Sequence, residues 1–443
     1  MATQPTDHPG IDEPVVVTFE QVAKALGTTE ALGNLNEAAG RDDRTPPVEK
    51  AAIMAGIGNV LEQIRKAEAS VGAKVLTTPH DARAARLQSL IASGEAANLK
   101  FGPLPSGGRE AMFDTDDWFG WASVAWEKLK HLKPHTMIRP QSRKAVPLAD
   151  VARIAVLGDW GTGLYGAPKI ADSVRTDPDP FAMILHLGDV YYSGTEREVN
   201  ERFLRVWPGR KEAVSRALNS NHEMYSGGDA YFGSTLPAFG QDGSYFAYQN
   251  ANWTLVGLDV AYIDHAIDDA QVDWLQGILH DAGDRKVVLF SHHQLYSSIE
   301  SEQGAKLWSH PGFGAILRSK RIFAWYWGHE HRCTVYAGKD SNFGIMGRCI
   351  GNSGMPQGRA ATIGLPRSAD PAFQEADWRQ CPAVTVEGNP LPPAMVLEGR
   401  NEFIKGEEEK FSPHGYAVLT LDGPHLKEQV KSATGKVIYE KVL

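Results

Sequence analysis

The pattern of apolar and polar positions changes near residue 150 and divides the chain into two parts. In the first part, apolar residues recur at helical spacing in three stretches, 53–64, 85–91 and 118–132. Such stripes predict amphipathic helices that pack against a core or a second domain. We therefore expect a mostly α-helical N-terminal region over residues 1–150, whose role the sequence leaves open.

From residue 151 onward the pattern is one of short apolar runs followed by helical spacing. A hairpin is expected over residues 244–260, and a helix is expected to open at Asp268. The other strand-like runs are 154–157, 183–187, 286–290, 322–327, 416–421 and 437–439. Alternating strands and helices predict an α/β layered domain over residues 151–443, with helices covering the sheets. Within it, residues 355–413 are rich in Pro and Gly and predict a loop-rich insertion.

Composition narrows the classes of function without choosing one. The net charge of -9 argues against a general nucleic-acid or membrane-surface binder, because such proteins usually carry a basic face. The N-terminus has neither a basic start nor an apolar run, and no stretch approaches the roughly 20 apolar residues of a membrane span, so we expect a cytoplasmic protein. Three cysteines without a Cys-x-x-Cys spacing argue against a disulfide framework. The oligomeric state stays open.

Candidate chemistry lies in five short polar motifs, four of which follow or end a strand-like run. They are Gly158-Asp159-Trp160-Gly161, Gly188-Asp189-Val190-Tyr191-Tyr192, Ser220-Asn221-His222-Glu223, Ser291-His292-His293 and Gly328-His329-Glu330-His331. Each motif alone is compatible with an ordinary turn or a packed histidine, but the ordered set is specific. Strand ends in α/β folds are where ligand-binding loops gather. Asp, Asn, His and Tyr together suit Fe, Zn or Mn.

Two of these motifs indicate how a pair of metals could be held. Because His329 and His331 are separated by one residue, they project to the same side of an extended segment and can reach two adjacent metals. Asp189 is suited to bridge such a pair, since a carboxylate can give one oxygen to each metal. The sequence therefore predicts a dinuclear site.

The ordered series resembles that of the calcineurin-like metallophosphoesterase superfamily. The resemblance covers residues 150–350 directly, and the C-terminal strands are similar to that family's ending. Within the superfamily, the chain is closest to the purple acid phosphatases. The usual first motif is Asp-x-His, but here Asp159 is followed by Trp160-Gly161; a tyrosine, Tyr192, stands three residues after Asp189 instead. That paired exchange is typical of the purple acid phosphatases.

The resemblance implies a metallophosphoesterase-type layered β-sheet sandwich flanked by helices, with two metal ions at its centre. The first metal would be held by Asp159, Asp189, Tyr192 and His331, and the second by Asp189, Asn221, His292 and His329. A tyrosinate ligand favours Fe(III) in the first position, with Fe, Zn or Mn in the second.

The same resemblance implies an acid-phosphatase-like hydrolase that cleaves small-molecule phosphate monoesters by a metal-bound hydroxide. His222 would contact the phosphate or protonate the leaving alkoxide, Glu223 would orient His222, and His293 would line the pocket. One departure is that Ser220 stands where the family has Gly; if that Gly is needed for its backbone angle, Asn221 would shift.

Two other functions stay open on the sequence. The first is a phosphodiesterase or nuclease that uses the same dimetal site, although the acidic net charge argues against nucleic acid. The second is a catalytically silent binding or scaffold protein, in which the N-terminal helices carry the function. The complete ligand set counts against the second.

Overall fold

The structure, a computed structural model, describes residues 134–191, 193–386, 388–404 and 408–443. It also describes the backbone of three short strands nearer the N-terminus, β1 (Val15–Val16), β2 (Lys100–Pro103) and β3 (Arg109–Met112), of which β2 and β3 pair antiparallel. The three helical stretches predicted before residue 133 lie outside the described residues. The chain divides into two compact units, and the second one, Lys133–Phe403 with Glu408–Leu443, carries all the features that follow. The predicted domain division at residue 150 stays a prediction.

A six-stranded sheet is built around the parallel strands that end in the first three motifs. Its order is β20-β19-β18-β5-β6-β7, with β5, β6 and β7 parallel and the others antiparallel. The strands are β5 (Val151–Leu157), β6 (Met183–His186), β7 (Val214–Ala217), β18 (Gly415–Asp422), β19 (His425–Ser432) and β20 (Val437–Val442).

A nine-stranded sheet carries the last two motifs. Its order is β14-β17-β12-β13-β11-β10-β9-β8-β4, with a parallel centre of β9, β10, β11 and β13. The strands are β4 (Val146–Pro147), β8 (Phe246–Gln249), β9 (Trp253–Gly257), β10 (Lys286–Ser291), β11 (Ile322–Trp327), β12 (Cys333–Lys339), β13 (Met346–Ile350), β14 (Asp377–Gln380) and β17 (Ala394–Glu398).

The helices of this unit are short. The α-helices are α6 (Gly166–Thr176), α7 (Asn221–Tyr225), α8 (Leu236–Ala238), α9 (Asp269–Ala282), α10 (Ala305–Ser309) and α11 (Pro311–Arg318). Two π-helical segments, η1 (Glu198–Leu204) and η2 (Tyr231–Thr235), and two 3₁₀ turns, η3 (Pro371–Phe373) and η4 (Glu408–Lys410), complete the set. The predicted opening at Asp268 is confirmed, because this residue caps α9 by accepting from the N–H groups of Ala270 and Gln271. Across the described residues, every helix is too short or too polar to cross a bilayer.

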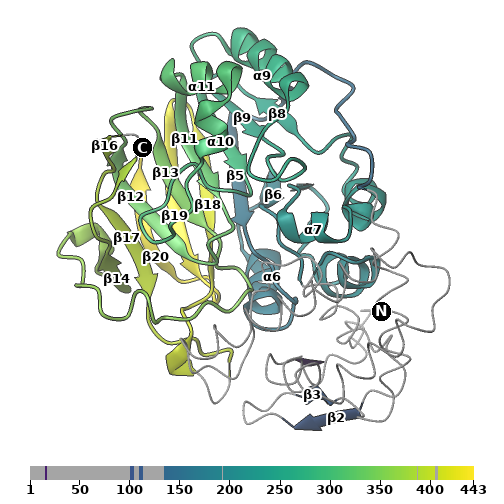
Figure 1. The fold of residues 1–443 in the computed structure, drawn as a ribbon, viewed down its shortest axis with the longest axis vertical. Coiled ribbons are helices and arrows are strands. Elements are labelled where there is room, and N and C mark those ends of the chain that lie inside the picture. The colour runs from purple at the N-terminus through teal and green to yellow at the C-terminus, as the bar shows by residue number, and fades with distance from the viewer. Residues whose placement is uncertain are drawn as a thin grey trace, which may run out of the picture. The chain divides into compact units, whose positions relative to one another are not determined.

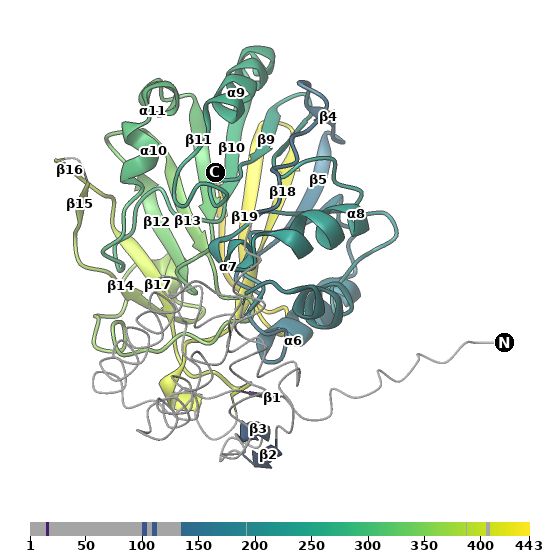
Figure 2. The same ribbon diagram turned by 45° about the vertical axis from the view of Figure 1, so that its right-hand side comes forward.

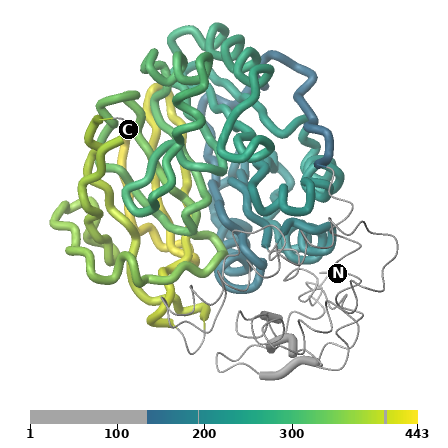
Figure 3. The backbone as a smooth tube through the Cα atoms, viewed as in Figure 1, coloured from purple at the N-terminus to yellow at the C-terminus, as the bar shows by residue number. Residues whose placement is uncertain are grey.

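The two sheets pack face to face, and helices cover their outer faces (Figures 1 and 2). Val156 of β5 and Phe290 of β10 lie in the apolar core between the sheets. Outside the nine-stranded sheet, Leu275 of α9 packs into a second core. Outside the six-stranded sheet, Ile170 of α6 packs into a third. The predicted α/β sandwich flanked by helices is therefore confirmed, and Figure 3 traces the backbone through these layers.

The predicted loop-rich segment 355–413 contains strands as well as loops. Strands β14 and β17 pair with each other, and β17 pairs with β12 at the edge of the nine-stranded sheet. A further small pair is formed by β15 (Thr385–Val386) and β16 (Asn389–Pro390). Nothing in the apolar pattern indicated these short strands.

A buried ion pair joins the two sheets. Nε of Arg348, on β13, donates to both carboxylate oxygens of Glu428, on β19, at 2.8 and 2.9 Å. Both side chains are at most 1% exposed, and the hydroxyl of Tyr326 also donates to Glu428. Removing one partner of a buried pair leaves the other charge buried without compensation. Substitution of either residue should therefore destabilise the packing of the two sheets.

We expect Glu428→Gln to lower the free energy of unfolding by about 3–5 kcal/mol, since the Arg348 guanidinium would stay buried opposite a neutral amide. Urea denaturation measures the change. The matched control is Glu440→Gln, which breaks the exposed pair with Lys427 and should cost less than about 1 kcal/mol. Equal losses in the two variants would contradict the structural role of the buried pair.

Candidate metal centre

The predicted ligands lie at the carboxyl ends of neighbouring strands. Asp159 follows β5, Asp189 follows β6, His292 follows β10, and His329 follows β11. Pairing between β5 and β6, and between β10 and β11, is parallel, so these ends fall on the same side of each sheet. This is the edge where α/β folds place their ligand-binding loops.

Backbone strain is concentrated at these ligands. Six non-glycine residues in the described part of the chain have a positive φ, and four of them are predicted ligands: Asp159 (57°), Asp189 (74°), His329 (70°) and His331 (51°). The left-handed region costs a non-glycine residue about 1–2 kcal/mol, so it persists only where the surroundings fix it. The chain thus holds these side chains in conformations that local preference disfavours.

Asp189 is the meeting point of the side chains. It is fully buried, and its Oδ1 accepts a hydrogen bond from Oγ of Ser220 at 2.6 Å. The same oxygen lies 3.2 Å from Nε2 of His292, while Oδ2 lies 3.3 Å from Nε2 of His331. The two carboxylate oxygens therefore face two different histidines, as a bridging carboxylate requires.

The other predicted ligands gather on either side of Asp189. On one side, Oδ1 of Asp159 lies 3.6 Å from Nε2 of His331. On the other, Nε2 of His292 lies 2.9 Å from Oδ1 of Asn221 and 3.2 Å from Nδ1 of His329. Ligand atoms of Asp159, Asp189 and His331 lie within 4.8 Å of one another, and so do those of Asp189, His292 and His329.

Tyr192 lies outside the described residues, so its predicted place at the first metal stays a prediction. Its neighbour Tyr191, which the sequence analysis did not select, is buried at the same site. The Tyr191 hydroxyl lies 3.0 Å from Nε2 of His331. Burial, followed by the charges of Asp189 and Asp159, raises the pKa of this phenol well above its usual range.

The buried carboxylates and imidazoles of the site shift one another's pKa values. Burial and the charge of Asp189 raise the pKa of Asp159 well above its usual range. Burial alone would raise the pKa of Asp189 too, but His292 and nearby imidazoles hold it well below that range. Within the described residues, histidines are the only ion-pair partners of the two carboxylates. Burial also lowers the pKa of His292, which keeps it neutral, the form that binds metals. Buried carboxylates with neutral imidazoles and an amide oxygen fit two ions of the Fe, Zn or Mn type.

Close packing around the ligands requires glycine at position 188. Gly188 has a φ of 107°, and a Cβ there would lie 2.8 Å from Cβ of Ser220 and 2.9 Å from Nδ1 of His292. Ser220 itself has a φ of -137°, which any residue adopts, so the expected shift of Asn221 does not arise from this exchange. Instead, the Ser220 side chain caps helix α7 and holds Asp189.

Glu223 supports the loop that carries Asp189. Its carboxylate accepts from the N–H groups of Asp189 and Val190, both at 3.3 Å, and contacts the Ser220 hydroxyl. Burial, followed by the charge of Asp189, raises the pKa of Glu223 to about 8. The contacts with Asp189, Val190 and Ser220 add a positioning role to the predicted one of orienting His222.

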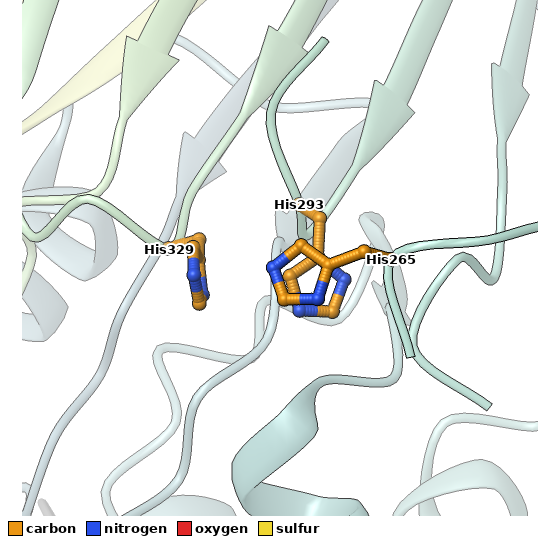
Figure 4. Close-up of side chains that lie close together, drawn as sticks. All are labelled: His265, His293 and His329. Carbon is orange, nitrogen blue, oxygen red and sulfur yellow. The ribbon is translucent and has the colours of Figure 1, made fainter. Parts of the chain in front are cut away.

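His222 and His293 flank the dimetal site without belonging to either group of ligands that shares Asp189. The ring of His222 stacks on that of Tyr191, with centroids 3.8 Å apart. His293 is fully buried, and its Nδ1 lies 3.1 Å from the carbonyl oxygen of Val260. Figure 4 shows His293 beside His329, together with His265, which the sequence analysis missed.

Three further residues contact the predicted ligands. Ser220 and Tyr191 lie within the predicted motifs but had no predicted role there. Gln357 had no motif at all, and its Oε1 lies 3.3 Å from Nδ1 of His331. Gln357 lies 26 residues beyond His331, in the segment predicted as an insertion. No spacing rule links such a pair, because the contact depends on how a long loop returns to the site.

Glu330 lies between the two ligand histidines, and we expect it to make the stability of the fold depend on pH. Oγ of Ser297 and Nε1 of Trp327 donate to its carboxylate at 2.6 and 2.8 Å, yet burial raises the pKa of Glu330 to about 7. A carboxyl with a raised pKa stabilises the fold fully below its unfolded pKa, and that contribution is lost as the pH rises through the folded value.

In the presence of a chelator, the free energy of unfolding of the wild type should fall by about 3 kcal/mol between about pH 5 and pH 8. The free energy of unfolding of Glu330→Gln should not show this fall, because its amide does not titrate. Urea denaturation at several pH values measures the difference. Glu375→Gln, at an exposed position, should keep the wild-type slope. Parallel curves for the wild type and Glu330→Gln would show that burial does not disfavour this charge.

A family model matches the part of the chain that carries these motifs. Residues 152–333, which contain all five motifs, match the family model described as calcineurin-like phosphoesterase. No match was found among curated protein sequences. The match covers less than half of the chain, and over that segment it agrees with the resemblance seen in the motifs.

Solved structures of low sequence identity are also similar to the chain. A purple acid phosphatase, PPD1, from yellow lupin (Lupinus luteus) seeds is 13% identical over 67% of this chain, with a TM-score of 0.46. The chain covers 54% of that enzyme's length. A dimetal phosphatase from Danio rerio is 15% identical over 66% of this chain and 98% of its own, with a TM-score of 0.38.

Proposed function

We propose that the chain is a dinuclear, metal-dependent phosphohydrolase of the purple acid phosphatase kind, acting on small-molecule phosphate monoesters. The observation that carries the proposal is the place of Asp189 in two ligand groups, one with Asp159 and His331 and the other with His292 and His329. A carboxylate shared in this way is what two cations about 3.5–4 Å apart require.

The residues of this chain have distinct tasks in the proposed reaction. Asp159, Asp189 and His331, with Tyr192, bind the first cation; Asp189 also binds the second, with Asn221, His292 and His329. When bound, the two cations polarise the phosphoryl group and activate water for attack.

His222 is the proposed general acid, because its imidazole lies at the site but outside both ligand groups. It would give its proton to the oxygen of the leaving alcohol. Glu223 and Ser220 keep the Asp189 loop in place, so that the geometry is set before substrate arrives.

The proposal is tested by the metal content and the visible spectrum of the purified protein. We expect about two metals per chain, with iron among them, and a broad visible absorption that disappears in Tyr192→Phe but persists in the adjacent Tyr191→Phe. The reverse result would place the metal-bound phenolate at Tyr191. A colourless protein with two Zn or Mn would contradict the purple acid phosphatase assignment and keep the dimetal one, whereas a protein that binds no metal would overturn both.

Assays on matched monoester and diester substrates then test the substrate class. The monoester should be the better substrate by kcat/KM. A preference for the diester would instead support the phosphodiesterase or nuclease alternative, and two bound metals without turnover of either ester would support a silent binding protein.

A further inference from the structure

Three imidazoles meet beside the dimetal site on its second-metal side. His265 lies in the loop between β9 and α9, His293 follows β10, and His329 follows β11. Ligand nitrogens of the three lie within 4.8 Å of one another. The ring centroids of His265 and His293 are 3.7 Å apart, and those of His293 and His329 are 4.7 Å apart (Figure 4). His265 and His293 belong to neither of the two groups that share Asp189.

Each ring is oriented through its Nδ1. Nδ1 of His265 lies 2.6 Å from Oδ1 of Asp264, and Nδ1 of His293 lies 3.1 Å from the carbonyl oxygen of Val260. Nδ1 of His329 faces His292, on the side of the second metal. A metal-binding histidine usually donates its other ring N–H to a carboxylate or a carbonyl oxygen, which fixes the tautomer and the ring direction. His265 and His293 are held in that way, with Nε2 left as the ligand atom.

The remaining nitrogen of His293 has no protein partner among the described residues. Nε2 of His293 is buried and accepts no hydrogen bond within the described residues. A buried polar atom without a partner is rare in folded proteins and is often completed by a water or an ion. His265 also has a φ of 56°, one of only six positive values at non-glycine residues in the described part of the chain, so its backbone is held in a strained conformation beside the cluster.

A carboxylate stands next to the three rings. Oε1 of Glu302 lies 3.0 Å from Nε2 of His265, and Oε2 lies 3.8 Å from Nε2 of His329. The Glu302 side chain is 52% exposed, whereas those of His265 and His329 are 14% and 13% exposed. Negative charge thus faces the outer nitrogens from the solvent side, where an ion would enter.

We propose that His265, His293 and the outer nitrogen of His329 hold a third divalent cation of the zinc type, with Glu302 at its open side. Three imidazole nitrogens and a carboxylate form a donor set that Zn²⁺ favours. With Zn–N bonds of about 2.0–2.1 Å, ligand nitrogens come to about 3.3 Å from one another, so binding draws the cluster together.

The proposed site shares one ligand with the dimetal centre. His329 would bind the second metal through Nδ1 and the third through Nε2, as a bridging imidazolate that releases its one ring proton to solvent. The inference therefore rests on the proposed function only through His329. His265 and Glu302 have no role in that function, so substitutions at these two positions separate the two proposals.

Counting ions tests the site directly. The chelated protein is titrated with Zn²⁺ alone, bound metal is counted after gel filtration, and the last step is followed by competition with a chromophoric chelator. We expect three Zn²⁺ per chain in the wild type and two in His265→Phe, which keeps a flat ring against His293 but offers no nitrogen. His425→Phe, at an exposed position at the start of β19, is the matched control and should bind three.

Glu302→Gln is the second variant, in case His265→Phe fails to fold. It should retain three sites but weaken the third about 10–100-fold, the usual cost of removing a carboxylate beside a metal-binding histidine. The third site would be overturned if the wild type bound two ions, or if both variants bound three ions with wild-type affinity. Either result would leave the dimetal proposal standing. No bound ion in the wild type would overturn both.

Discussion

Replacing Asp189 with asparagine is expected to lower kcat/KM for a phosphate monoester by more than about 100-fold. Loss of a residue that only hydrogen-bonds to a metal ligand lowers activity by about 10–100-fold, and loss of a ligand to both metals should lower it further. The physical reason is that Asp189 belongs to both ligand groups and offers one oxygen toward His292 and the other toward His331. An amide replaces one of these oxygens with a hydrogen-bond donor and removes the negative charge that offsets two cations. The loss of activity should therefore be accompanied by a loss of metal.

Metal content and activity are measured on the same sample of Asp189→Asn. The matched control is Asp172→Asn on helix α6, where the carboxylate is 60% exposed and pairs with Arg175. That variant should keep both metals and stay within about twofold of the wild-type rate, as expected for an exposed pair away from the site. An Asp189→Asn protein with two metals and undiminished turnover would refute the bridging role.

The second large effect is expected at His222. His222→Ala should lower kcat by about 10²–10⁴-fold, the usual contribution of a positioned general acid. Metal content should not change, because His222 lies outside both ligand groups. Its ring stacks on Tyr191 instead.

The choice of substrate separates proton donation from phosphate binding. An alkyl phosphate has a leaving group that needs a proton, while a nitrophenyl phosphate leaves readily without one. If His222 is the general acid, the defect should be much larger for the alkyl ester. An equal defect for both esters, with a raised KM, would assign His222 to phosphate binding instead, and His425→Ala is the control for loss of an exposed histidine.

Much of this molecule was predictable because its signals are local. The strands that end at Asp159, Asp189, His292 and His329 are continuous apolar runs, and such runs are typical of parallel strands buried on both faces. The cap at Asp268 was likewise visible as an acidic residue before a helical stripe. Strands β7, β12, β13, β14, β17 and β19 were missed. Of these, β14 and β17 lie at or next to the edge of the nine-stranded sheet, where pairing rather than composition makes them strands.

At the site, the sequence determined which side chains are available, and the tertiary structure decided how they face one another. The five motifs identified the carboxylates and imidazoles through residue type, order and position at strand ends. They did not show that Glu223 accepts from the Asp189 backbone, or that Ser220 donates to its carboxylate. These contacts join loops 31–34 residues apart, so no helical or strand period relates them.

His265 shows the same limit most clearly. As a single histidine in a loop it carries no motif, and its meeting with His293 and His329 depends on three separate chain segments. The turns that bring them together include residues with positive φ, which the apolar pattern does not encode. The sequence thus determined the phosphoesterase ligands and the strands that carry them. Only the packing of two sheets, which brings distant loop ends to one edge, decided the direction of each ring nitrogen and carboxylate oxygen.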